Sequence, residues 1–278
     1  MGLATKGAVT EKGLKNAGSN VWQVYLKYTI IFMLVSGVIF SQFALYGKTL
    51  IWKTDGFLQW YPLMAKLKSF TTDFLSGNGF DFWSWDTGLG ADWIGNYALI
   101  FCDPFNYLVM FFSKEKLDVA YSVIMVVKMY AAGAAMLAFL RYHRKSEAVC
   151  MMGAIGYALC AWSLISSRHD FFITQLILFP LIILGVDKVE DRKSPLTLIF
   201  SVMLSVVNSL YFSYMTALFV AVYIIIGYFT GEGRKTAGDF LKKLFRYILY
   251  AVLGGVFLSA PVLVPALYAL TNTSTGSG

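Results

Sequence analysis

Charged side chains are scarce in this sequence. They make up 14% of the 278 residues, whereas 58% are hydrophobic and the mean hydropathy is +0.62. Water-soluble domains carry charge on about a quarter of their residues, so this chain has too little polar surface to cover itself in water. Three cysteines exclude a disulfide framework, and six prolines with 17% aromatic residues exclude a collagen-like, coiled-coil or disordered chain. An integral membrane protein remains.

Long hydrophobic runs follow one another along the chain. A helix that crosses the ~30 Å hydrocarbon core needs about 20 apolar residues, and seven runs come near that length. The fifth and sixth are divided only by Asn208, Ser209 and Tyr211, so one long broken helix there would change the topology. Pro261 and Pro265 predict a bend in the last run. The sequence therefore predicts an all-α polytopic membrane bundle of about seven spans. The expected spans are residues 26–46, 119–140, 147–166, 171–186, 196–210, 212–229 and 245–270.

Cations are distributed unevenly between the loops. Residues 1–25 have the composition of a flexible tail and contain lysines, and alternate short loops of the membrane domain, 26–278, are also cationic. The loop around Arg168 has one cation and the loop around Ser209 has none. Because cations in short loops stay in the cytoplasm, the N-terminus is expected there. The net charge of +7 then reports topology and does not indicate nucleic-acid binding. The cations of the cationic loops are Arg141, Arg144 and Lys145, then Lys188, Arg192 and Lys193, then Arg234, Lys235, Lys242, Lys243 and Arg246.

Residues 47–117 form the one sizeable segment between spans, and this topology places it outside the cell. It holds five of the seven tryptophans beside several carboxylates. Tryptophan rings anchor well at headgroup depth, and aromatic faces next to carboxylates also suit a sugar, which packs its C–H faces on rings. Composition alone favours anchoring. Within this segment, residues 98–113 are apolar but short, and Asp103 and Pro104 interrupt them, which predicts an interfacial or re-entrant helix with an N-cap near Asp103.

Acidic residues in the middle of this segment raise the question of a metal. Asp81, Asp86 and Asp92 offer oxygen ligands of the kind that Mg²⁺ or Mn²⁺ prefers. Turn formation, as at Asn78-Gly79, explains such residues more simply. We therefore predict no metal site and no cofactor, with a divalent cation left open.

Five short motifs occur in order along the chain and carry a resemblance. The motifs are Thr54-Asp-Gly-Phe-Leu-Gln-Trp-Tyr-Pro62, Gly88-Leu-Gly90, Asp103-Pro-Phe-Asn106, Arg168-His-Asp-Phe-Phe172 leading to Pro180 and Gly185, and Leu258-Ser-Ala-Pro261 with Pro265. Together they cover nearly the whole sequence, which resembles the N-terminal portion of the bacterial YfhO family.

The resemblance implies a function and a location. YfhO proteins resemble the GT-C class of multi-span glycosyltransferases, which act on the outer face of the bacterial plasma membrane with a polyprenyl-phosphate-linked sugar donor. The implied acceptor is a cell-envelope polymer such as lipoteichoic acid. Family members are usually much longer than this chain, which we interpret as the N-terminal part of their architecture.

Asp55 is the candidate catalytic residue. In the GT-C class an essential acid follows the first span in the first outer loop, and Asp55 occupies that place here. A carboxylate at the membrane surface is suited to take the proton of an acceptor hydroxyl. If a helix begins there, Gln59 shares its face at i+4 and, with Tyr61, orients sugar hydroxyls. The alternative is that Thr54 or Asp55 only caps that helix.

A departing phosphate needs cationic or hydrogen-bonding partners. Arg168 can bind its oxygens bidentately, although a salt bridge with Asp170 is the simpler interpretation. His169 either bonds the phosphate or lies at the interface. Lys128 falls within the second span, where a cation defaults to a functional hypothesis. The donor phosphate is its predicted partner, with snorkelling or pairing with a first-loop carboxylate as alternatives.

Two other classes of function stay open. A lipid-linked sugar transporter would also use an intramembrane cation and broken helices, but it predicts repeats between the halves of the chain, and none is visible. A non-catalytic partner in envelope assembly is the third class.

Overall fold

The computed structural model describes residues 20–79, 83–85, 90–230 and 236–272, and within these ranges almost every element is a helix. The predicted all-α class is confirmed. The elements of the first half are α2 (Val21–Leu45), η2 (Gly56–Trp60), α3 (Tyr61–Leu75), β1 (Trp83–Ser84), β2 (Ala91–Asp92), α4 (Trp93–Phe101), η3 (Pro104–Phe111) and η4 (Lys114–Lys116). Those of the second half are α5 (Leu117–Tyr142), α6 (Glu147–Ala158), α7 (Ala161–Ser166), α8 (Asp170–Glu190), α9 (Leu196–Asn208), α10 (Leu210–Thr230), α11 (Ala237–Val252), η5 (Leu253–Leu258) and α12 (Ala260–Asn272).

Five helices of the described chain are long and apolar enough to cross a membrane, and a bent pair would make a sixth. The helix α9 is apolar but has only 13 residues. It ends because Ser209 is extended, with φ −163° and ψ 112°, so the fifth and sixth predicted runs are two separate helices. The five long spans are Val21–Leu45, Lys114–Tyr142, Glu147–Ser166, Asp170–Glu190 and Leu210–Thr230.

The last predicted span is strongly bent. Ala237–Leu258 and Ala260–Tyr268 form an angle of 66° on either side of Ser259, just before Pro261. Pro261, at the start of the second piece, has no backbone N–H to donate. The Ser259 hydroxyl donates a hydrogen bond to the carbonyl oxygen of Gly255. The bend predicted from the prolines is present, and it carries α12 over α4.

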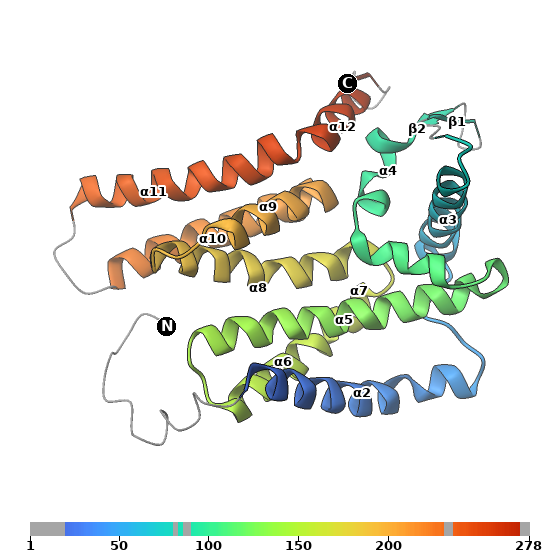
Figure 1. The fold of residues 1–278 in the computed structure, drawn as a ribbon, viewed down its shortest axis with the longest axis horizontal. Coiled ribbons are helices and arrows are strands. Elements are labelled where there is room, and N and C mark those ends of the chain that lie inside the picture. The colour runs from blue at the N-terminus through green and yellow to red at the C-terminus, as the bar shows by residue number, and fades with distance from the viewer. Residues whose placement is uncertain (1–19, 80–82, 86–89, 231–235, 273–278) are drawn as a thin grey trace.

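The spanning helices lie side by side along the long axis of the molecule, and the shorter elements gather at one end (Figure 1). This end, called here the α3 end, holds α3, α4, α12 and the antiparallel pair of Trp83–Ser84 with Ala91–Asp92. The opposite end holds the short connections between α5 and α6 and between α8 and α9. The described part of the predicted segment 47–117 therefore lies at the α3 end, apart from these two cationic loops.

The helix α5 is the centre of the larger of the two main cores. Tyr121, Ile124 and Met125 on its first turns are fully buried, and α5 packs against α3 and η3. Further along, Gly133 allows α2 and α6 to approach, since a Cβ there would lie 2.8 Å from the carbonyl oxygen of Ala154. A second core joins α8, α9 and α11 around Ile182, Val186, Leu198 and Tyr247.

Polar contacts tie the helices together at the end with the cationic loops. His143 Nε2 lies 2.9 Å from Asp187 Oδ2, and the Tyr142 hydroxyl donates to Asp191 over 2.6 Å. Lys27, which lies just after the expected tail of residues 1–25, pairs with Glu147 at 2.6 Å. These bonds fix the ends of α2, α5, α6 and α8 relative to one another.

The stretch 98–113 is interrupted and capped as the sequence predicts. The apolar stretch 98–113 breaks at Cys102 into α4 and the 3₁₀ helix η3. Asp103 caps η3, because its side chain accepts from the Phe105 N–H at 3.0 Å. The N-cap prediction is confirmed.

Candidate functional site

Asp55 lies at the α3 end, where the connection after α2 turns into the π-helical segment η2. It has the N-cap position of this segment, but its side chain makes no capping hydrogen bond. The carboxylate is 49% exposed and accepts no hydrogen bond from a described residue. Asp55 therefore does not cap the helix through its side chain, and its carboxylate oxygens are accessible to a ligand.

His169 brings a second part of the chain to this carboxylate. It precedes α8, and its Nε2 lies 3.4 Å from Asp55 Oδ2, while Nδ1 lies 2.8 Å from Trp60 Nε1. An indole N–H can only donate, so Nδ1 accepts and carries no proton. The single proton of the neutral ring must then be on Nε2, the nitrogen that faces Asp55. The sequence gives no indication of this Trp60–His169–Asp55 arrangement.

Burial lowers the pKa of His169 below its usual value, although the Asp55 carboxylate opposes the effect and Arg168 reinforces it. The geometry has the same consequence, because a second proton on Nδ1 would face the Trp60 donor. His169 is therefore neutral at pH 7, and its Nε2–H can donate a hydrogen bond to a ligand beside Asp55.

Lys128 is fully buried between two carboxylates. Its Nζ is 2.7 Å from Asp103 Oδ2 and also contacts Asp170 Oδ1, and none of the three side chains is exposed. Thr174 donates its hydroxyl to the same Asp103 oxygen, and Asn106 Nδ2 donates to Asp170 Oδ2 over 2.7 Å. These five residues, the Lys128 cluster, join η3, α5 and α8.

The Lys128 cluster corrects the partner predicted for Lys128. Its ammonium contacts no open space that a donor phosphate would occupy, and Asp103, a carboxylate of the segment 47–117, takes that place. Asp103 caps η3 and Asp170 is the first residue of α8, so both carboxylates also lie at the positive ends of helices. The simpler interpretation of Arg168, a salt bridge with Asp170, is also wrong, because Asp170 pairs with Lys128.

The other predicted site residues lie near Asp55 and are less enclosed. Arg168 is exposed and makes no hydrogen bond or ion pair with a described residue. Gln59 is exposed too, and Tyr61 stacks on Phe57 with ring centroids 6.4 Å apart. The segment is π-helical, with the Tyr61 N–H bonded to the Gly56 carbonyl, so the i+4 face predicted for Gln59 does not apply.

A cavity of about 460 Å³ lies beside this group. The C-terminal part of α2 and residues 49–53 form most of its wall, together with Leu164 and Ser167. Lys53, two residues before Asp55, and Ser167, which precedes Arg168, are polar members of the lining. The sequence shows Lys53 only as one of several cations in a long loop, and nothing in it pairs this loop with residues 164–169.

No group of three or more His, Cys, Asp or Glu side chains among the described residues is arranged to hold a metal ion. Of the acidic trio considered from the sequence, Asp92 lies in β2. Asp81 and Asp86 fall outside the described residues.

Comparison with known proteins places the chain in a family. The sequence model described as "Bacterial membrane protein YfhO" matches residues 28–277. The chain belongs to the YfhO family. This confirms the resemblance carried by the five motifs, and the helical spans agree with a multi-pass YfhO membrane protein.

A curated YfhO relative is much longer than this chain. The protein of Bacillus subtilis (strain 168) described as "Uncharacterized protein YfhO" is 26% identical over 137 residues. The match covers 47% of this chain and 15% of the relative. No solved structure shows a significant match.

Removal of the Lys128 ammonium is expected to destabilise the protein strongly. In Lys128→Met, two buried carboxylates lose their cation, and breaking a buried pair in this way costs about 3–5 kcal/mol. Denaturant titration of the protein in detergent measures the free energy of unfolding. Lys243→Met is the matched control, because Lys243 pairs with Glu190 near the surface, where such a pair is worth about 0–1 kcal/mol. Equal losses in the two variants would contradict this account of the Lys128 cluster.

The neutral state of His169 predicts how stability depends on pH. An unfolded histidine titrates near pH ~6.5, and native His169 titrates below it. Between these values the unfolded chain binds more protons, so stability rises with pH across this window and is lost as pH falls through the native pKa. Thermal unfolding in detergent from about pH 7 to about pH 5 should show this loss, and His169→Gln should reduce it.

Trp60→Phe provides the second arm of this pH test. It removes the indole donor from Nδ1, so protonation of native His169 becomes easier and its pKa moves back toward that of the unfolded chain. The loss of stability should then be smaller and complete at a higher pH. An unchanged pH dependence in both variants would show that His169 does not titrate in this range.

Proposed function

We propose that this chain contributes the outer-face site of a membrane glycosyltransferase, which moves a sugar from a polyprenyl-phosphate donor to a cell-envelope polymer such as lipoteichoic acid. The observation that carries the proposal is the approach of Asp55 and His169, 114 positions apart in the sequence, to 3.4 Å at the α3 end. A half-exposed carboxylate beside a neutral imidazole, next to a cavity with a cation on its wall, offers a base and phosphate ligands in one place.

The reaction assigns one task to Asp55. The acceptor hydroxyl oxygen forms a bond to the anomeric carbon of the donor sugar, and the bond between that carbon and the lipid phosphate breaks. The electron pair of this bond leaves with the phosphate, and the proton of the acceptor hydroxyl passes to the Asp55 carboxylate. Gln59 and Tyr61 lie on the adjoining segment, where they orient the sugar hydroxyls.

The phosphate is assigned to the residues around the 460 Å³ cavity. Arg168 has no protein partner among the described residues and is free to chelate phosphate oxygens. His169 donates from Nε2, and Lys53 lies where the apolar wall from α2 ends. A lipid phosphate with its chain toward the bilayer suits such a lining. Lys128 acts as a positioning residue, because it holds Asp170 and therefore the adjacent His169.

This proposal requires the α3 end to face the exterior and the N-terminus to be cytoplasmic. Support comes from the cations at the opposite end, among them Arg144, Lys145, Arg192 and Lys193, because short cationic loops remain in the cytoplasm.

Surface labelling of single cysteines tests this orientation. In a background with the three natural cysteines replaced, Ser76→Cys lies at the α3 end and Ser194→Cys at the other, and both positions are exposed. A membrane-impermeant maleimide added to intact cells should label Ser76→Cys alone, and permeabilised cells should show both. Labelling of Ser194→Cys alone in intact cells would overturn the proposed function.

Asp55→Asn tests the catalytic assignment. The amide keeps the shape of the side chain but cannot take the proton, so transfer should fall by about 10²–10⁴-fold. The measurement is the sugar content of the envelope polymer in cells that carry the complete gene, normalised to the amount of protein. Asp73→Asn is the control, since Asp73 is an exposed carboxylate on α3. Unchanged glycosylation in Asp55→Asn would remove Asp55 from catalysis.

A further inference from the structure

Among the described helices, α2, α3, α5 and α8 end in the same hydrogen-bonded turn, a Schellman motif. The residue after the C-cap has a left-handed backbone, its N–H bonds to the carbonyl three residues earlier, and the following N–H bonds to the carbonyl five residues before it. The left-handed residues are Gly47, Gly77, Arg144 and Arg192, with φ of 57°, 81°, 52° and 57°.

The residue in the left-handed position differs between the two ends of the molecule. Glycine takes it at the α3 end, where the absence of a Cβ makes this backbone conformation freely accessible. At the opposite end an arginine takes it in both motifs, and a lysine follows each, as Arg144-Lys145 after α5 and Arg192-Lys193 after α8. A Cβ disfavours the left-handed backbone, so both dipeptides are kept at a conformational cost. Such a cost at two matching positions indicates a function.

Membrane topology alone does not account for these positions. The rule that retains cationic loops in the cytoplasm counts the cations of a loop and is indifferent to their backbone conformation. Attraction to the negative end of a helix is likewise available throughout its last turn. Neither effect needs an arginine where glycine is preferred, so the arginines must contribute more than the charge of a loop.

Hydrogen bonds bring the two dipeptides together. The C-cap of α8, Asp191, accepts the hydroxyl of Tyr142 on α5 over 2.6 Å. The C-cap of α5, His143, lies 2.9 Å from Asp187 on α8. Lys193 Nζ donates to the same Tyr142 hydroxyl over 2.9 Å. The residue before each arginine is therefore bound to the other helix.

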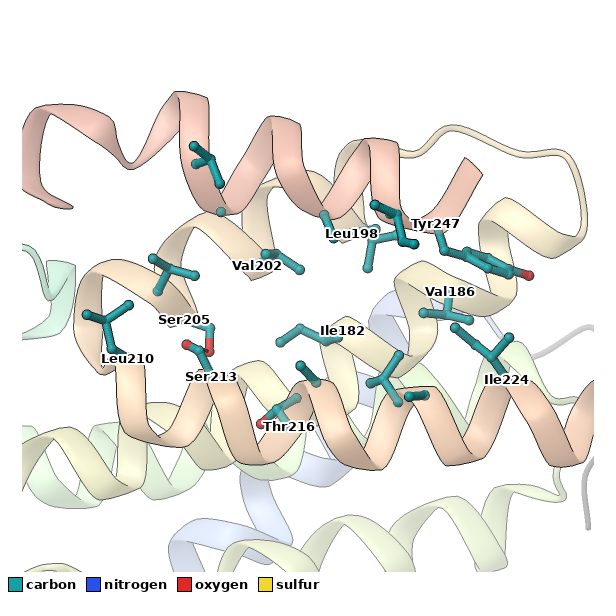
Figure 2. A pocket seen from close by; sticks show the side chains of 18 of the residues that line it. Ile182, Val186, Leu198, Val202, Ser205, Leu210, Ser213, Thr216, Ile224 and Tyr247 are labelled. Carbon is teal, nitrogen blue, oxygen red and sulfur yellow. Dashed lines mark hydrogen bonds between the residues drawn. The ribbon is translucent and has the colours of Figure 1, made fainter. Parts of the chain in front are cut away.

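The helix pair that carries the second motif is closely packed. Val186 of α8 and Leu198 of α9 belong to one buried apolar cluster (Figure 2). At Gly185 the two helices approach so closely that a Cβ would lie 2.6 Å from Leu198 Cα. The connection between α8 and α9 is therefore held on both sides, and its arginine starts from a fixed backbone position.

Three of the four cations of these dipeptides are uncompensated. Arg144, Lys145 and Arg192 are exposed, and their side chains make no hydrogen bond or ion pair with a described residue. Lys193 lies 3.5 Å from Asp191. The carboxylates of the same connections and of the last turn of α8 have donors of their own, which leaves the three cations in excess. Glu147 binds Lys27, Asp187 binds His143 and Tyr223, Glu190 binds Lys243 and Tyr247, and Asp191 binds Tyr142.

The chemistry and the place of these cations select a phosphate of the membrane. A guanidinium binds the oxygens of a phosphate bidentately. Both α5 and α8 belong to helical segments that are long and apolar enough to span a membrane, so their ends lie at its surface, where lipid headgroups supply phosphodiesters. Each Lys or Arg close to an anionic membrane surface increases affinity by about fivefold. An acidic protein would complement the same charges but has no such reason to lie at the ends of two spanning helices.

We infer that Arg144-Lys145 and Arg192-Lys193 together bind the headgroup of an anionic phospholipid, with the two guanidinium groups on its phosphodiester. Lys145 and Lys193 strengthen the positive potential around it. The inference is independent of the sugar transfer and of the orientation proposed above, because it requires only that this end of the molecule lies at a membrane surface.

Lipid titration of the full chain in neutral detergent micelles tests the inference. Native mass spectrometry measures the binding of short-chain phosphatidylglycerol, with short-chain phosphatidylcholine as the neutral reference. Phosphatidylglycerol should bind more tightly, and Arg144→Gln/Arg192→Gln should lower this preference by about 25-fold, because two cations that contribute about fivefold each are lost. Lys114→Gln/Lys116→Gln is the matched control, because it removes two exposed lysines at the other end of α5 and should keep the preference.

Glycine variants separate the charge from the backbone. Arg144→Gly/Arg192→Gly should lose the preference as the glutamine variant does. In micelles without anionic lipid it should also unfold at a higher temperature than the glutamine variant, because both lack the charges and only glycine adopts the left-handed backbone freely. A stable protein without the lipid preference would show that the arginines serve binding and are not needed for folding.

Three results of the titration contradict the inference: equal binding of the two lipids to the parent protein, equal losses of preference in the arginine variants and the lysine control, or displacement of phosphatidylglycerol by inorganic phosphate at the same concentration. Capture of another polypeptide by a photoreactive residue at position 145 in cells would assign the two turns to a protein partner and overturn it too.

Discussion

The ion pairs of Lys128 with Asp103 and Asp170 are the contacts on which the rest of the structure depends. All three groups are fully buried, so each charge is tolerable only while the others are in place. The three residues come from η3, α5 and α8, so the pairs join these three elements in the interior of the bundle. Because Asp170 follows His169 directly, the position of the imidazole is set by the same ammonium that holds η3.

The helix α5 relates the two parts of the candidate site to each other. Ser122 Oγ accepts the Leu50 N–H at 3.0 Å and so holds the connection that leads to Asp55. Lys128, six positions later on the same helix, holds the start of α8. The two anchor points are about 9 Å apart along one rigid helix, which lets segments distant in the sequence meet at 3.4 Å. Trp60 then selects the tautomer of His169.

Much of the architecture is predictable because it follows from local rules. Apolar run length identified the five long spans and the bent pair but also counted the shorter α9 as a span. Asp103 before Pro104 identified the cap of η3, and Pro261 identified the bend near Ser259. The cost of an intramembrane cation singled out Lys128 as a residue with a specific partner, and a first-loop carboxylate was among the partners considered. The length of α9 was not predictable from the apolar run, because the position of its end depends on the extended backbone of Ser209.

The meeting of Asp55 and His169 was beyond reach for a different reason. The contact joins residues 114 positions apart, and no local pattern encodes it. Tryptophan composition favoured interfacial anchoring, but Trp60 is 8% exposed and donates to His169. The π-helical winding of η2 has its own effect. A shortening of this segment by one residue would restore a regular α-turn and shift the angular phase of Trp60 by about 100°, which would carry the indole away from the imidazole. The number of residues between Asp55 and Trp60 therefore sets the direction of the indole. Insertions or deletions there should be far less tolerable than substitutions.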